Sequence, residues 1–385
     1  MASTRQEPLL PRGVTLPKDV AVPNDTALAI YFPPNELDSR SYVQSLGLWV
    51  EPGRALQESR SEVAVKLFPQ TIAATVGGTG QYGLLIAAHP LWSVNGGVLR
   101  LEMKYRVYDP AGKELRNSSQ VQTAGISANT AAIRAVTYKA MQMVLVDVLR
   151  ELAPSAAKYP ATGEVGKIPP ATLVRRDEPV STGTGFFING TGQMLTAAHV
   201  VRDCVVVEAQ KDGVTFPVTR HAESSLLDLA VIDSGRASTA ALPLRTGQTL
   251  VLGEAVTNVG FPLSGLLANS PNLTRGNVSA RAGLKGSVGL FQFSAPIQPG
   301  SSGGPVVSDG GELLGVTVST LNIAALVNQG LLPQNVNFAL DAKYAAAFLR
   351  HENVAFTEVA PRANGSMQQA NDAALGAVVQ LSCYQ

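Results

Sequence analysis

The chain has 385 residues, enough for about two or three domains with sizeable cores. Charged residues make up 15% of it and hydrophobic residues 45%, which is typical of a globular protein and excludes an intrinsically disordered one. The formal net charge is +1, without a Lys/Arg cluster of the size that nucleic-acid binding needs, so we expect no nucleic acid among its partners.

The N-terminal part of the chain predicts a tether followed by a small α+β domain. Residues 1–24 are polar and proline-rich, which is typical of a flexible tether. Residues 25–152 then alternate between runs with strand-like and helix-like periodicity. The elements expected there are a strand at 26–32, a helix at 53–68, a strand at 83–89, a hairpin that begins with the alternating run 98–109, and a helix at 127–152.

The composition changes after this domain. Residues 153–171 hold four prolines and two glycines, which predicts an interdomain linker. From 172 to 351, turn residues separate short β-like runs, which predicts an antiparallel barrel or sandwich with one helix at 341–351. The runs are GFFIN, QMLTAA, CVVVEA, LLDLAVI, EAVTNVG, LFQFSA, LLGVTVS and NVNFAL. Residues 352–385 are expected to form a polar tail that ends in the strand-like stretch AVVQLSCYQ.

The stretch QPGSSGGPVV holds two adjacent serines, Ser301 and Ser302, between glycines. It fits either a flexible turn between strands or the loop of a serine nucleophile. A serine hydroxyl is a poor nucleophile until a base takes its proton, and that base needs an acid to orient it. The second interpretation therefore demands a histidine and a carboxylate elsewhere in the chain.

His199 and Asp228 are the candidates for the base and the acid. His199 lies in LTAAHVV, where an apolar strand is expected to meet a turn. Asp228 lies in LLDLAVI, inside a predicted strand, where an unpaired carboxylate would be costly, so we expect a partner such as a histidine. Asp233 is the rival, but five residues along a strand put it on the opposite face. The remaining histidines are expected in the N-terminal domain, in a polar turn and at a helix end, respectively: His89, His221 and His351.

Motifs follow one another in the order His199, Asp228, Ser302: GTGFFI, TAAHVV, DLAV, GSSGGPV and NFAL. In this order and rough spacing they resemble the trypsin-like serine proteases, most of all the bacterial Deg/HtrA branch, over residues 172–351. The resemblance implies a mainly β fold, a chymotrypsin-like double antiparallel β-barrel, here preceded by the smaller α+β domain. It also implies a serine endopeptidase that cleaves proteins or peptides through an acyl-enzyme, without a metal site or an organic cofactor.

The resemblance implies a role for each matching residue. Ser302 looks like the nucleophile, His199 like the general base and later acid, and Asp228 like the group that holds the histidine tautomer. The amides of Gly300 and Ser302 look like the oxyanion hole. Ser301 stands where pancreatic-type enzymes have an aspartate, so activation by a new N-terminus that pairs with that acid is not expected. Deg-type enzymes usually carry a PDZ domain after the protease, and the ~34 residues that follow the barrel are too few for one.

The primary specificity pocket is expected to be apolar. By position, Ile297 and Val336 look like its walls, and Pro296 lies where a trypsin would place its pocket acid. A pocket without a carboxylate cannot compensate the desolvation of Arg or Lys. The sequence therefore predicts cleavage after small or medium apolar residues.

Two other functions fit parts of the sequence. Ser302, Asp341 and His351 occur in the order of an α/β-hydrolase triad, but that fold needs helices between the strands before the serine, and none is expected there. The second alternative is a catalytically silent binding module of the bacterial envelope that uses a protease fold. An intact set of His199, Asp228 and Ser302 argues against it.

The start of the chain leaves the location open. No apolar run approaches the ~20 residues of a membrane-spanning helix, and MASTRQEPLLPRG lacks the basic-then-apolar order of a signal peptide. One interpretation is an ordinary cytoplasmic or secreted start. The other is a numbering that begins after a removed signal, because ASTRQEP is similar to the stretch after the lipidated cysteine of bacterial lipoproteins, and the α+β domain loosely resembles modules of envelope lipoproteins. That interpretation predicts a periplasmic or envelope protein with a lipid anchor.

The two cysteines, Cys204 and Cys383, fit neither a zinc site nor a disulfide-dense scaffold. Cys204 opens the predicted strand CVVVEA, and Cys383 lies in the last strand-like stretch. In an oxidising periplasm, a disulfide between them would hold this last strand against the first barrel. Two buried free thiols are the alternative.

Overall fold

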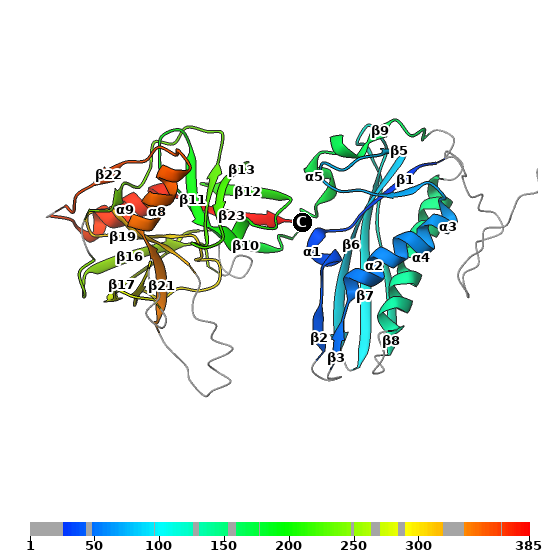
Figure 1. The fold of residues 1–385 in the computed structure, drawn as a ribbon, viewed down its shortest axis with the longest axis horizontal. Coiled ribbons are helices and arrows are strands. Elements are labelled where there is room, and N and C mark those ends of the chain that lie inside the picture. The colour runs from blue at the N-terminus through cyan, green and yellow to red at the C-terminus, as the bar shows by residue number, and fades with distance from the viewer. Residues whose placement is uncertain are drawn as a thin grey trace, which may run out of the picture. The chain divides into compact units, whose positions relative to one another are not determined.

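The computed structural model describes residues 26–43, 48–95, 97–125, 131–152, 159–176, 178–247, 250–262, 270–283, 289–318, 335–362 and 364–385. The chain divides into two compact units (Figure 1), which are Met1–Arg175 with Gln385, and Arg176–Tyr384. Each unit has its own hydrophobic core. None of the described helices is both long and apolar enough to cross a membrane.

The N-terminal unit is built on a five-stranded mixed sheet with the strand order β4-β1-β6-β7-β8. β1 (Leu28–Tyr31) lies parallel to β4 (Thr71–Ala73) and to β6 (Leu84–Asn95), and β7 (Val98–Tyr108) and β8 (Glu114–Gly125) continue the sheet antiparallel. Along β7, every second side chain is buried, as the alternation in its sequence predicts. The strands and the hairpin predicted for this unit are confirmed.

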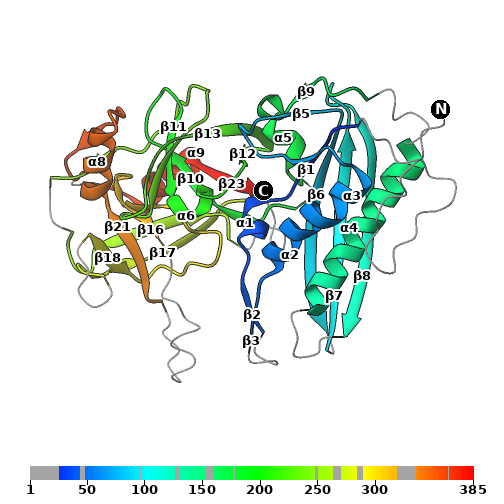
Figure 2. The ribbon, with the colours of Figure 1, turned by 45° about the vertical axis from the view of Figure 1, so that its right-hand side comes forward.

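Helices cover one face of this sheet (Figure 2). One helical segment consists of α2 (Pro52–Glu58), a π-helical turn (Ser59–Ala64) and α3 (Val65–Leu67), and the long helix α4 (Ala131–Leu152) packs against it. Their apolar side chains join those of the sheet in one core, so both predicted helices are confirmed. The unit also contains α1 (Pro34–Leu37) and the hairpin of β2 (Ser41–Val43) and β3 (Leu48–Val50).

The second half of the predicted linker 153–171 is part of the N-terminal unit. β9 (Gly163–Glu164) pairs with β5 (Gln81–Tyr82), and α5 (Pro170–Leu173) follows. The apolar residues of this segment are buried in a cluster with side chains of β1 and β6: Val165, Ile168 and Leu173. This segment is therefore a packed loop and not a free linker, because its apolar side chains are buried against the sheet and removed from water.

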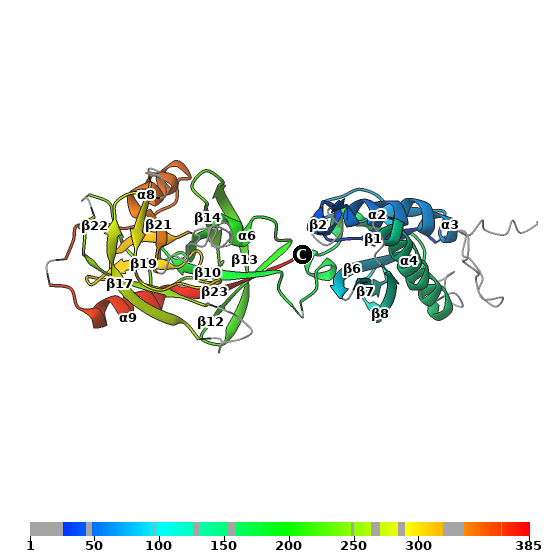
Figure 3. The same cartoon turned by 90° about the horizontal axis from the view of Figure 1, so that it is seen from below.

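The first barrel of the C-terminal unit closes through six strands. In spatial order they are β10 (Ser181–Phe187), β11 (Gln193–Ala197), β14 (Leu229–Asp233), β13 (Val214–Ser224), β12 (Val206–Lys211) and β23 (Val378–Tyr384). β23 pairs with both β10 and β12 and lies between them in Figure 3. The expected tail 352–385 thus supplies a mostly buried barrel strand, because its alternate apolar side chains complete the barrel core.

The second barrel also closes through six strands. They are β19 (Pro305–Ser308), β16 (Ala255–Gly260), β17 (Asn272–Ala280), β18 (Leu290–Phe293), β21 (Asn337–Asp341) and β20 (Leu313–Thr317), and the pairing of β19 with β20 completes the ring. β15 (Leu244–Arg245) and β22 (Glu358–Val359) extend it, and α8 (Ala342–His351) and α9 (Met367–Ala377) pack on the core of this unit. The predicted double barrel and the helix at 341–351 are confirmed.

The sequence did not predict β13, β17, β19 and α9. β17 has the sequence NLTRGNVSA, in which polar residues occupy both faces, so no alternation marks it. α9 is rich in alanine, and its buried face consists of Ala370, Ala374 and Ala377, which give only a weak amphipathic pattern.

Candidate active site

His199 and Asp228 lie side by side at one end of the first barrel. β11 pairs with β14 so that Ala197 lies opposite Leu229, and α6 (Ala198–Val201) begins directly after β11. This register brings His199 against the residue that precedes β14. The backbone N–H of His199 donates to Asp228 Oδ1 over 3.0 Å, and His199 Nδ1 lies 2.7 Å from Asp228 Oδ2.

The sequence predicted Asp228 inside a strand. In the structure it lies in the turn before β14. Its φ of 50° is in the left-handed region, where aspartate is better tolerated than most residues other than glycine. Burial by itself raises the pKa of the Asp228 carboxyl, but the hydrogen bonds from His199, with the charges of His199 and Arg202, outweigh burial and hold that pKa below its usual value. The carboxylate is therefore stabilised in its charged form.

The other candidate acids and bases lie elsewhere. Asp233 ends β14, at the end opposite to Asp228, and accepts a hydrogen bond from the Gly235 N–H (2.8 Å). His221 belongs to β13, not to the expected polar turn, at the position where a bulge shifts the register. His89 lies in β6 of the N-terminal unit, and His351 ends α8 beside Glu352, as predicted.

The two adjacent serines differ in their surroundings. Ser301 is only 4% exposed and its hydroxyl faces the Gln298 N–H at 3.4 Å, inside the loop. Ser302 is partly exposed. The Ser301 N–H also donates to Gln298 O (2.9 Å), which closes a β-turn with Pro299 at its second position and Gly300, at φ 100°, at its third. This is the geometry of a type II turn, for which proline and glycine at these positions are favoured.

The amides around Ser302 fall into two groups. The N–H groups of Ser301, Gly303 and Gly304 donate to carbonyls within the loop or in β20. Among the described residues, the N–H groups of Gly300 and Ser302 donate to no group of the chain. Within the loop 298–304, the two amides that the resemblance assigns to an oxyanion hole are thus the two that donate to none of the described residues.

Gly303 brings this loop against the first barrel. It has a φ of 81°, and a Cβ on it would lie 2.2 Å from Thr184 O and 2.7 Å from Ala197 N. Only glycine fits such a contact. The residue after Ser302 thus touches the residue two positions before His199, so the loop that carries Ser302 packs against the end of β11 that leads into His199.

The two expected pocket walls both belong to the second barrel. Ile297 is partly buried and packs against the core of this barrel, and Val336 is partly buried just before β21. Asn337 was not singled out from the sequence, but it is 4% exposed and its Nδ2 donates to Ala295 O over 2.7 Å, which ties the two segments together. A buried amide in an apolar strand needs such a partner.

A family model described as a trypsin-like peptidase domain matches residues 183–316. Residues 183–316 form a trypsin-like peptidase domain. The match begins at β10 and ends in β20, so that it includes His199, Asp228 and Ser302.

The peptidase domain is homologous to serine proteases of the DegS/HtrA type. The uncharacterized protein y4bJ of Sinorhizobium fredii is 42% identical over 44% of this chain and 27% of that protein. The serine endoprotease DegS of Salmonella typhimurium is 29% identical (43% of this chain, 47% of that protein), and the putative serine protease HhoA of Synechocystis is 35% identical (36% of each). The alignments thus span less than half of each relative.

Among solved structures, the serine endoprotease from Yersinia pestis matches with a TM-score of 0.38 and 24% identity, over 45% of this chain and 58% of that one.

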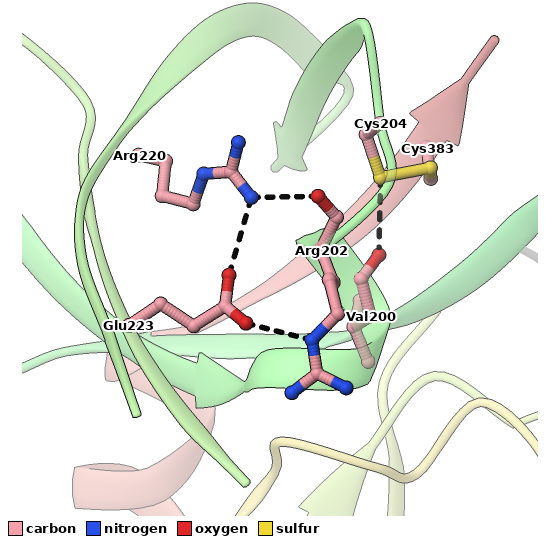
Figure 4. Close-up of a disulfide and its surroundings, with 6 residues drawn as sticks. All are labelled: Val200, Arg202, Cys204, Arg220, Glu223 and Cys383. Atoms are coloured by element: carbon pink, nitrogen blue, oxygen red, sulfur yellow. Dashed lines mark hydrogen bonds and ion pairs between the residues drawn. A yellow bond between two sulfur atoms is a disulfide. The ribbon is translucent and has the colours of Figure 1, made fainter. Parts of the chain in front are cut away.

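A disulfide lies next to the helix that carries His199. Cys204 and Cys383 are joined, with their Cα atoms 5.3 Å apart, so that the segment after α6 is linked to β23 (Figure 4). Cys204 Sγ also lies 3.4 Å from Val200 O. On the other side of the segment, Glu223 accepts from Arg202 Nε (2.7 Å) and from Arg220 Nη1 (3.1 Å). The disulfide and the Arg202–Glu223–Arg220 contacts thus hold the segment after α6 from both sides.

We predict that loss of this disulfide destabilises the peptidase domain. The bridge spans 179 residues of sequence, for which the chain-entropy model gives about 5 kcal/mol. In urea, the unfolding midpoint of the Cys204→Ala/Cys383→Ala double variant should lie well below that of the oxidised protein. Mass spectrometry after alkylation without reductant checks the bridge itself. Two alkylated thiols in folded, air-exposed protein would rule it out.

Proposed function

We propose that this protein is a serine endopeptidase that hydrolyses peptide bonds of proteins or peptides through an acyl-enzyme. The observation that carries the proposal is the pair of contacts between His199 and Asp228, at 3.0 and 2.7 Å, beside the loop that carries Ser302. The homology of the peptidase domain to serine proteases supports it.

In the proposed reaction, Asp228 holds His199 through Nδ1, which leaves Nε2 to accept a proton. As Ser302 Oγ bonds to the carbonyl carbon of the substrate, its proton passes to His199 Nε2. The positive charge that forms on the imidazole is stabilised by the Asp228 carboxylate, whose lowered pKa keeps it ionised.

The carbonyl oxygen of the substrate becomes negatively charged in this step. In the proposed reaction the N–H groups of Gly300 and Ser302 donate to it, which breaks no hydrogen bond within the described part of the chain. The C–N bond then breaks, and His199 returns its proton to the leaving amine. Water attacks the ester of Ser302 by the same route and releases the acid. This chemistry requires no metal or organic cofactor.

A fluorophosphonate probe tests the proposal, because it labels only a serine that is activated as a nucleophile. We expect wild-type protein to be labelled at Ser302, as located by peptide mapping, and to hydrolyse an unfolded protein substrate. A catalytically silent binding module with a protease fold would bind peptides but resist the probe. Folded wild-type protein that is not labelled would therefore contradict the proposal and favour the binding module.

We predict cleavage after small or medium apolar residues such as Val, Ala or Leu. Ile297 and Val336 supply apolar walls, and the described wall segments 295–300 and 335–338 contain no carboxylate that could pair with a substrate cation. A peptide library whose cleavage sites are mapped by mass spectrometry measures the preference. A profile dominated by Arg or Lys before the cleaved bond would overturn the prediction.

We also propose that the protein works in an oxidising compartment such as the bacterial periplasm or envelope. The Cys204–Cys383 disulfide supports this, since structural disulfides rarely persist in the cytoplasm. A lipid anchor at the N-terminus remains a prediction, which the sequence encoded upstream of Met1 tests. A signal with a cysteine at its cleavage point is the expected result.

A further inference from the structure

Thr184 of β10 connects the first barrel to both sides of the nucleophile. Its side chain is completely buried. The hydroxyl donates to Gly300 O over 2.8 Å and accepts from the Phe261 N–H over 3.0 Å. The backbone N–H of Thr184 donates to Ser302 O over 2.9 Å. One residue of the first barrel thus holds the carbonyls of both residues whose amides would form the oxyanion hole.

These bonds hold the peptide planes next to the two amides. The Gly300–Ser301 plane is held at both ends, because its oxygen accepts from Thr184 Oγ1 and its N–H donates to Gln298 O. The Ser302–Gly303 plane is held in the same way, by the Thr184 N–H and by Thr317 O. Each of the N–H groups of Gly300 and Ser302 therefore lies next to a peptide plane that is held at both ends by hydrogen bonds.

The Thr184 hydroxyl also sets the loop relative to His199. β10 pairs with β11, and His199 follows β11 by two residues. Thr196 of β11 strengthens this link, since its hydroxyl donates to Thr184 O over 2.7 Å. The distance between the oxyanion donors and the base thus depends on a short path through Thr184.

We propose that Thr184 is a positioning residue, whose hydroxyl holds the Gly300 amide in its oxyanion-binding orientation before substrate arrives. The inference rests on the proposed function. Valine has the shape of threonine but cannot donate to Gly300 O or accept from the Phe261 N–H, so it would remove the hydrogen bond that holds the turn. A donor that is misplaced by a fraction of an ångström lowers the rate of the chemical step more than it weakens substrate binding.

The test compares Thr184→Val and Thr184→Ser with wild-type protein. We expect Thr184→Val to lower kcat about 10- to 100-fold with KM within about twofold, and Thr184→Ser, which keeps the hydroxyl, to stay within about threefold of wild type. The affinity for a peptide boronate, whose tetrahedral adduct uses the two amides, should fall with kcat. Thr257→Val is the matched control, since its buried hydroxyl in β16 accepts from Arg275 Nη1 (2.8 Å) and, among the described residues, has no hydrogen bond to the loop 298–304.

The outcomes distinguish the positioning role of Thr184 from the proposed peptidase activity. Wild-type kcat and boronate affinity in Thr184→Val would overturn the positioning role, and so would an equal loss in Thr184→Ser. If Thr184→Val does not fold, Thr184→Ala replaces it, because alanine and serine differ only by the hydroxyl in question. Failure of the proposed function itself is recognised separately, as wild-type protein that neither reacts with the fluorophosphonate probe nor hydrolyses peptides.

Discussion

Replacement of Ser302 by alanine is expected to lower kcat/KM roughly a million-fold. The variant lacks the oxygen that bonds to the substrate, and no other hydroxyl can take its place. The fold should survive, because Ser302 is tied to the first barrel through its carbonyl, which accepts from the Thr184 N–H. Peptide hydrolysis, probe labelling and thermal unfolding of the variant measure these three expectations.

Ser301→Ala is the matched control. Ser301 is the adjacent serine of the same loop, but its hydroxyl is buried and faces the Gln298 N–H. We expect this variant to keep its activity within about tenfold of wild type, because it loses one weak loop contact and no reacting atom. Equal activity of Ser302→Ala and wild type would refute the assignment of the nucleophile.

Asp228→Asn is expected to lower kcat by roughly ten thousand-fold while the fold is retained. The amide can still contact His199, but it favours the wrong tautomer and cannot stabilise the imidazolium that forms when Ser302 loses its proton. Steady-state kinetics on a peptide substrate measure the loss. The control is Asp233→Asn, at the other end of β14, where the hydrogen bond from the Gly235 N–H can be kept. Loss of activity in the Asp233 variant alone would reverse the assignment.

The lowered pKa of Asp228 also gives a stability prediction. Because the folded state holds this pKa below its unfolded value of about 4, the carboxylate contributes stability above pH ~4 and loses it as the pH falls through the folded pKa. Urea unfolding at pH 7 and at pH 3 should therefore show a smaller acid loss for Asp228→Asn than for wild type. An equal loss in both proteins would mean that the His199–Asp228 contact is not formed in solution.

Local patterns in the sequence were sufficient for much of the fold. The helical spacing of 53–68 and 127–152 and the alternation of 98–109 predicted elements that the structure contains, because burial on one face of a helix or strand leaves a regular period in the chain. The order and surroundings of His199, Asp228 and Ser302 were sufficient to name a candidate site. The sequence did not predict β17 and α9, because their buried residues are too few or too small to leave a clear periodic pattern.

Pairing between distant segments decided the rest. The sequence does not state that β23 lies between β10 and β12, nor that Val165 and Ile168 of the expected linker pack against an apolar sheet face. The same holds for Thr184, which stands in the motif GTGFFI without any local sign of its contact with Gly300, 116 residues away. The sequence by itself determined which residue types stand in which order and which segments have a buried face. Only the tertiary structure decided which of two adjacent serines is partly exposed and which amides of the described loop 298–304 donate to other segments, because those properties depend on contacts between parts of the chain far apart in sequence.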